Sequence, residues 1–177
     1  MKKPQNGFSL IELLIVVAII LIIASIAIPN LLRSKIAANE SSAVSSIRTI
    51  NTAEMTYQSA WGTGFAAGLA NLGGPVPCTT ATAAAACIID PLLSNAPFTK
   101  SGYVFNAAGT IPIGTVNNGF ELNATPLLVQ TTGVRMFCAN QTGLIQFVSP
   151  AAGAGIGVAP GACAAVPNVP GTSGPVN

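Results

Sequence analysis

The segment that most constrains this chain runs from Phe8 to Ile28 and is apolar almost throughout its 21 residues. As a helix it would be about 32 Å long, which is enough to cross the hydrocarbon core of a bilayer. Lys2 and Lys3 precede it, so the positive-inside rule keeps its start cytoplasmic and sends the residues from 30 onward outside. The sequence therefore predicts one membrane-spanning helix followed by an extracytoplasmic part.

Glu12 lies four residues inside this apolar segment. A carboxylate costs about 2.5–3.5 kcal/mol on insertion scales at the centre of a membrane helix, and less near an end. One interpretation is a tolerated charge that snorkels to water and interacts with the positive end of the helix. The other is that Glu12 pairs with a positive charge supplied by another copy of the chain.

The stretch KKPQNGFSLIELLIVVAIILIIASIAIP resembles the leader of type IV pilins and pseudopilins. That pattern is a short basic leader ending in Gly, then Phe, then a hydrophobic stretch with Glu fifth after the cut; Gly7, Phe8 and Glu12 match it. The resemblance implies that a prepilin peptidase cleaves between Gly7 and Phe8 and methylates the new amine of Phe8. It also implies that Glu12 neutralises the N-terminal amine of a neighbouring subunit in a filament, and that Pro29 bends the helix.

An ordinary secretory signal is the alternative for this segment. Its apolar region would be shorter, 7–15 residues, and a small-residue cleavage site would follow. ASIAIPN offers a weak site near Ala27, and cleavage there would leave a soluble secreted protein. The length of the apolar run and the continuation of the helical pattern past Asn30 disfavour this interpretation.

The helical pattern continues beyond Pro29 to about Ala60 and ends at the breaker Gly62-Thr63-Gly64. Proline lacks an N–H and crowds the preceding turn, so a kink or local unwinding is expected near Ala24–Pro29. In the second half the apolar residues recur at three- and four-residue steps and form a single stripe. The stripe consists of Val44, Ile47, Ile50, Ala53, Tyr57 and Trp61.

Short β-prone runs follow from Gly102: GYVFN, GFELNAT, GVRMFCAN and GLIQFVS, the last two separated by a plausible hairpin turn at residues 140–143. The predicted fold is therefore α+β. A long kinked N-terminal helix, about 8–60, packs by its C-terminal half on a three- to four-stranded antiparallel sheet, the arrangement that the resemblance to type IV pilins also implies. The expected contributors to the core of the sheet are Tyr103, Phe105, Phe120, Leu122, Phe137, Ile145 and Phe147.

Four cysteines all lie beyond the apolar segment, and an even number fits disulfides in an oxidising compartment. Four cysteines allow three pairings. We favour Cys78–Cys87 and Cys138–Cys163, the second attaching the C-terminal tail to the sheet as in many pilin heads. The residues after Cys163 show no periodicity and are expected to be a mobile end.

These patterns divide the chain into six parts. They are a removed leader at 1–7, a transmembrane or filament-core helix half at 8–32, an amphipathic helix half at 33–61, a Gly/Ala/Thr-rich loop region at 62–101, an antiparallel sheet at 102–148 and a Gly/Pro-rich tail at 149–177.

The composition argues against an enzyme. Histidine is absent, the five acids are not paired in sequence, and no phosphate-binding glycine motif is present. Glu40, Glu54 and Lys35 are interpreted as solvated helix positions or subunit contacts. No catalytic residue, cofactor or metal site is predicted. Without Met1–Gly7 the side-chain charge is zero, five basic against five acidic groups, so no binding of nucleic acid is inferred.

The sequence thus predicts a structural subunit of a type IV pilus-like filament, with prepilin peptidase, other pilin copies, the inner membrane and a pilus assembly machinery as partners. Before assembly it would be a single-pass bacterial inner-membrane protein with a cytoplasmic N-terminus, and afterwards part of an extracellular pilus or a periplasm-spanning filament. One alternative is a pseudopilin of a type II secretion system. Those proteins typically carry an acidic calcium loop, whereas no Asp or Glu follows Glu121 here. Another is a single-span membrane protein with a binding domain that never polymerises.

Overall fold

The computed structural model describes residues 8–149, 156–157, 159–169 and 172–176. The chain divides into two compact units, which we call the N-terminal unit, Met1–Lys35, and the head unit, Ile36–Asn177. Each unit is described by itself. Gly7, the residue before the expected cleavage site, lies outside the described residues.

One long helix, α1, covers Leu10–Trp61, close to the predicted 8–60. It ends where Gly62 adopts a left-handed backbone with φ of 64° and its N–H donates to the carbonyl oxygen of Gln58 at 3.0 Å. Glycine adopts this conformation without the steric cost that a Cβ would bring, which is why the helix stops at the predicted breaker. The helix is uninterrupted at Pro29, so the local unwinding expected there is not present.

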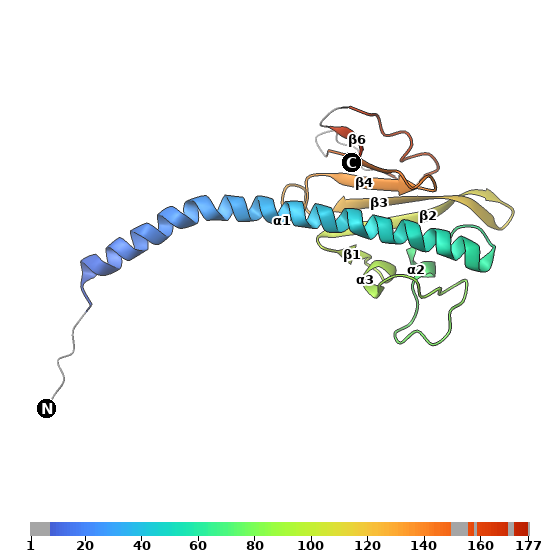
Figure 1. Cartoon of the computed structure of the whole chain (residues 1–177), viewed down its shortest axis with the longest axis horizontal. Coiled ribbons are helices and arrows are strands. Elements are labelled where there is room, and N and C mark those ends of the chain that lie inside the picture. Colours follow the sequence, from blue (N-terminus) through green and yellow to red (C-terminus); the bar gives the residue numbers. More distant parts are fainter. Residues whose placement is uncertain (1–7, 150–155, 158, 170–171, 177) are drawn as a thin grey trace. The chain divides into compact units, whose positions relative to one another are not determined.

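The head unit combines the C-terminal part of α1 with an antiparallel sheet, which confirms the α+β fold (Figure 1). The predicted strand number of three to four was wrong, because the sheet has six strands in the order β1-β2-β3-β4-β5-β6. The strands are β1 Thr99–Lys100, β2 Tyr103–Ile113, β3 Val116–Pro126, β4 Met136–Asn140, β5 Ile145–Val148 and β6 Ser173–Pro175.

The two strands missed from the sequence are the shortest, β1 with two residues and β6 with three. Neither is long enough to show the alternation of polarity on which strand prediction depends. Strand β6 pairs with β5 through Phe147 and Gly174 and lies in the tail that was expected to be a mobile end. That expectation was therefore wrong for Ser173–Pro175.

The long hairpin β2–β3 also exceeds the predicted runs. Each strand has 11 residues, and Gly114, with φ of 64°, lies in the turn. The sequence from Ala107 to Ile113 hides this length because Ala, Gly and Pro have low strand propensity. The other predicted turn is confirmed: Asn140 Oδ1 accepts a hydrogen bond from the N–H of Thr142 at 3.0 Å.

The core of the head unit lies between α1 and the sheet. The stripe on α1 is confirmed as its buried face, with Ile47 and Ile50 fully buried. All seven predicted sheet residues belong to the core except Phe147, which is only partly buried against it. Each fully buried side chain of this size contributes about 1.5–3 kcal/mol relative to leaving it exposed.

The loop region between α1 and β1 closes one side of this core and contains two single-turn helices, α2 Leu69–Leu72 and α3 Pro91–Ser94. Leu72 and Leu93 from these turns are almost fully buried. Their apolar side chains explain why a region rich in Gly, Ala and Thr is nevertheless ordered against the sheet. Asp90 begins α3, since its Oδ1 accepts a hydrogen bond from the N–H of Leu92 at 2.8 Å.

Candidate functional site

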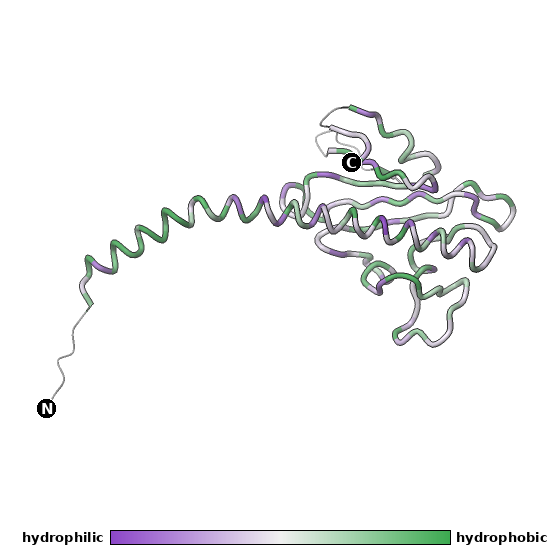
Figure 2. Tube along the Cα trace, in the orientation of Figure 1, coloured by the Kyte–Doolittle hydropathy of each residue, from purple (hydrophilic) through white to green (hydrophobic). Residues whose placement is uncertain are grey.

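The apolar part of α1 in the N-terminal unit exposes nearly all of its side chains. Exposed fractions run from 44% at Leu32 to 79% at Leu10, and Figure 2 shows hydrophobic colour almost without interruption over this stretch. Among the described residues there is one helix, α1, that is both long enough and apolar enough to cross a membrane. An isolated helix that exposes large side chains on every side is unfavourable in water. This surface therefore requires a lipid or protein environment.

Glu12 lies in the first turn of α1 and is held by the backbone just before the helix. The N–H of Ser9 donates to Glu12 Oε2 at 3.0 Å. The spacing Ser-x-x-Glu with this contact is half of a capping box, which satisfies a backbone donor at the helix start. The carboxylate thus lies at the positive end of the helix and next to Phe8, whose nitrogen would become the chain terminus after cleavage.

Pro29 occupies an interior position of α1 and cannot donate a hydrogen bond to the carbonyl of Ser25. One turn earlier, the hydroxyl of Ser25 donates to the carbonyl oxygen of Ile22 at 2.8 Å. A hydroxyl bonded back to the helix keeps its polar group satisfied within an apolar segment. The continuous helix shows that the proline is tolerated here, and the kink itself stays a prediction.

Glu40, predicted from the sequence to be a solvated helix position or a subunit contact, is instead buried within the head unit. It is 5% exposed, and its Oε1 accepts hydrogen bonds from the N–H groups of Val134 and Arg135 at 2.8 and 3.0 Å. Its Oε2 lies 2.7 Å from a guanidinium nitrogen of Arg135. The partners are 94 and 95 residues away in sequence, so no local pattern could have revealed them.

Glu54 was likewise predicted to be a solvated position or a subunit contact and is fully buried within the head unit. Its Oε2 accepts a hydrogen bond from the N–H of Ala66 at 2.9 Å. Burial raises the pKa of Glu54 to about 7, and the hydrogen bond from Ala66 opposes this only in part. The residue connects α1 to the chain segment that follows it, which is a structural role.

Glu121 holds the C-terminal tail against the sheet. Its Oε1 accepts from the N–H of Gly161 at 2.9 Å and its Oε2 from the N–H of Cys163 at 3.1 Å. Burial raises the pKa of this carboxyl group, while the two backbone hydrogen bonds act in the opposite direction. Both oxygens of the most C-terminal acid of the chain are thus engaged with the backbone of the tail.

Two disulfides, Cys78–Cys87 and Cys138–Cys163, join the pairs favoured from the sequence. The first closes a loop of nine residue steps within the region before β1. The second connects β4 to the tail and lies beside the contacts of Glu121, so around Cys163 the tail is held to the sheet by a covalent bond and by hydrogen bonds, in addition to the pairing of β6 with β5.

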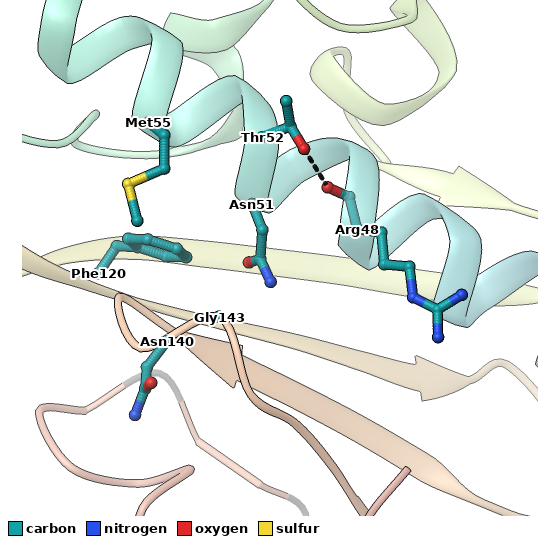
Figure 3. A pocket seen from close by; sticks show the side chains of 7 residues that line it. All are labelled: Arg48, Asn51, Thr52, Met55, Phe120, Asn140 and Gly143. Atoms are coloured by element: carbon teal, nitrogen blue, oxygen red, sulfur yellow. Dashed lines mark hydrogen bonds between the residues drawn. The ribbon is translucent and has the colours of Figure 1, made fainter. Parts of the chain in front are cut away.

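A surface cavity of about 400 Å³ lies between α1 and the β4–β5 turn (Figure 3). Met55 from the helix lies beside the ring of Phe120, and the amide of Asn51 is directed toward the turn. The lining residues are Arg48, Asn51, Thr52, Met55, Phe120, Asn140 and Gly143. They include one charged group and no acid, base or nucleophile set for catalysis. Within the described residues, no group of three His, Cys, Asp or Glu could hold a metal ion.

Comparison with known proteins places these features in a class. Residues 2–28 match the family described as Prokaryotic N-terminal methylation motif. A type IV major pilin protein, PilA, of Myxococcus xanthus strain DK1622 is 46% identical over 56 residues, covering 31% of this chain and 26% of that protein. The type II secretion system core protein G of Aeromonas hydrophila is 39% identical over 57 residues, covering 32% of this chain and 40% of that protein.

The chain is thus similar, over about a third of its length, to a type IV pilin and to a type II secretion core protein, and residues 2–28 carry the methylation motif. The aligned segments span between a quarter and two fifths of these relatives. No solved structure matches the chain.

Proposed function

We propose that this protein is the structural subunit of a type IV pilus-like filament, with no enzymatic activity. The observation that carries the proposal is the exposed apolar helix of the N-terminal unit, which begins with the methylation motif and has its only acid at Glu12. Packed side by side with copies of itself, such a helix would remove its apolar side chains from water or lipid. The same apolar helix surface would lie in the inner membrane before assembly and in the filament core afterwards, and both environments are apolar.

In this proposal a prepilin peptidase removes residues 1–7 and methylates the new amine of Phe8. Residues 8–32 then anchor the subunit in the inner membrane, with the N-terminus cytoplasmic, and later form the filament core. Residues 33–61 are the amphipathic helix half that carries the head, and the remaining segments form the outer surface of an extracellular pilus. The assembly machinery and other pilin copies are the partners.

Glu12 would act as a registration device between subunits. A carboxylate left unpaired in an apolar core is costly, and the N-terminal ammonium of a neighbouring copy offsets much of that cost. A subunit out of axial register would leave two charges unpaired. The contact between Glu12 and Ser9 supports this role, because it already directs the carboxylate to the end of the helix where the amine would form.

A pseudopilin of a type II secretion system is the second candidate, and the match to core protein G favours it. The use of Glu121 in packing and the lack of any later Asp or Glu argue for the pilus-like filament, because a calcium loop needs several oxygen ligands that usually include carboxylates.

The test is the intact mass and the N-terminal residue of the protein from its native host, together with filament yield of Glu12→Val and Glu12→Asp. We expect N-methyl-Phe8 as first residue, two disulfides in the mass, normal membrane insertion of Glu12→Val but strongly reduced filament, and partial recovery with Glu12→Asp. A chain that starts at Met1 in active cells would indicate a non-polymerising membrane protein. A start near Ala27 would remove the assembly helix and end the proposal, and normal filament yield from Glu12→Val would refute the role of Glu12.

A further inference from the structure

The loop between β3 and β4 exposes three large apolar side chains in a row. Leu127, Leu128 and Val129 are 53%, 61% and 52% exposed, and Val134 in the same loop is 38% exposed. No other described part of the head unit exposes three consecutive large apolar side chains. Such a contiguous patch marks a contact surface more often than a scattered single residue does.

The backbone of this loop is held firmly, so the patch is a defined surface. The carbonyl oxygen of Leu128 accepts hydrogen bonds from the N–H groups of Thr131 and Thr132 at 3.1 and 2.8 Å. The N–H of Gln130 donates to the carbonyl oxygen of Gly133 at 2.9 Å. These hydrogen bonds pair several of the loop's backbone donors and acceptors internally, which lowers the cost of moving the loop out of water.

The loop is attached to the first turns of α1 within the head unit. Asn39 Nδ2 donates to the carbonyl oxygen of Thr132 at 2.8 Å, and Glu40 accepts from the N–H of Val134 at 2.8 Å. Figure 1 shows the β3–β4 connection beside this end of the head unit, and the β2–β3 turn at the opposite end. At that opposite end the chain that follows α1 contacts β3 near the β2–β3 turn, because the N–H of Phe65 donates to the carbonyl oxygen of Asn117 at 2.8 Å.

The covalent chain limits how far this patch can lie from the apolar segment. Only seven residue steps connect Leu32, the last large apolar residue of that segment, to Asn39. Even fully extended, seven residues span at most about 25 Å. If the segment up to Leu32 lies in the bilayer, the patch is within reach of the membrane surface.

The electrostatics of this end also fit a membrane surface. Residues 127–134 carry no charge, and the ion pair beside them, Glu40 with Arg135, is neutral as a pair. Arg33 and Lys35, which lie in the sequence between the apolar segment and Asn39, supply positive charge for anionic headgroups. Apolar side chains beside cationic ones are typical of segments that lie at the headgroup–acyl boundary.

We propose that the β3–β4 loop docks on the lipid bilayer, with Leu127, Leu128 and Val129 inserted at the headgroup–acyl boundary while the subunit is still membrane-bound. The inference rests on the membrane anchoring contained in the proposed function. It adds a second membrane contact, made by the head unit itself, that would hold the unassembled subunit in a restricted orientation.

The test uses tryptophan fluorescence of the full chain in vesicles of phosphatidylethanolamine and phosphatidylglycerol with brominated acyl chains, which quench tryptophan on contact. The background is Trp61→Phe, which keeps an aromatic ring beside Tyr57. Three single-tryptophan variants are compared: Leu21→Trp in the apolar segment, Leu128→Trp in the loop, and Ile113→Trp as the matched control. Ile113 is 71% exposed and lies at the end of β2, about 30 Å along the strand from Tyr103.

We expect Trp at 21 to be strongly quenched, Trp at 128 to lose roughly half of its emission with a blue-shifted maximum, and Trp at 113 to be unaffected. Quenching at 21 without quenching at 128 would overturn the docking inference and leave the anchored subunit intact. Equal quenching at 128 and 113 would also overturn it, because the contact would not be specific to the loop. No quenching at 21 would overturn membrane anchoring and the docking inference together.

Discussion

Replacing Glu54 by Gln should remove a pH-dependent loss of stability from the head unit. The carboxyl group is fully buried and its pKa is raised from 4.5 to about 7 by burial. A folded-state pKa above the unfolded value means that the folded state favours the protonated form. The contribution of Glu54 to stability is therefore greatest below about pH 4.5, falls as the pH rises toward 7, and stays reduced above 7.

The size of this loss follows from the difference between the two pKa values. A difference of about 2.5 units at 1.36 kcal/mol per unit corresponds to about 3 kcal/mol above pH 7, as an order of magnitude. Glutamine retains an oxygen that can accept from the N–H of Ala66 and carries no charge. Glu54→Gln should therefore match the wild type near pH 4.5 and exceed it by about 3 kcal/mol at pH 8.

The assay is denaturant unfolding of the full chain in detergent between pH 4.5 and 8, followed by the fluorescence of Trp61. The ring of this tryptophan lies tilted by 31° against that of Tyr57, one turn beyond Glu54, with ring centroids 5.0 Å apart. The difference between the two stability curves removes the contribution of Glu121, whose pKa is also raised. Parallel curves over this pH range would show that Glu54 does not titrate in the folded state as burial requires, and would refute the reasoning.

Two further predictions concern the contacts that connect distant parts of the head unit. Glu40→Ala should lower the free energy of unfolding by about 3 kcal/mol, because it leaves two N–H groups of the β3–β4 loop and the Arg135 guanidinium without their partner. Hydrogen exchange at the N–H groups of Val134 and Arg135 should accelerate. Unchanged exchange there would contradict the role given to Glu40. Replacing Cys138 and Cys163 together by Ser should lower the free energy of unfolding by about 3.5 kcal/mol, and replacing Cys78 and Cys87 together by Ser should lower it by about 2.6 kcal/mol. The difference arises because the two disulfides close loops of 25 and nine residue steps. Urea unfolding of the two double variants measures the difference, and the reverse order would show that native-state effects outweigh loop entropy.

What the sequence determined by itself is everything that depends on neighbouring residues. The leader motif with Gly7, Phe8 and Glu12 is defined by residues close together in the sequence, and the apolar stripe from Val44 to Trp61 is defined by a local periodicity. The extent of α1 follows from such patterns and was predicted within a few residues, and the antiparallel character of the sheet was also predicted. The hairpin turn between β4 and β5 was predicted for the same reason, because its Asn and Gly act locally.

Only the tertiary structure decided the roles of the three acids in the head. Glu40, Glu54 and Glu121 accept hydrogen bonds from backbone N–H groups that lie 94, 12 and 40 residues away. The local pattern of a helix or strand does not indicate partners so distant in the sequence. Strand β6 forms because the tail is brought to the free edge of β5, not because its three residues favour a strand. The exposed patch at Leu127–Val129 is equally non-local: an apolar run reads as buried from sequence, and its exposure results from the way Glu40 and Asn39 hold the loop at the surface.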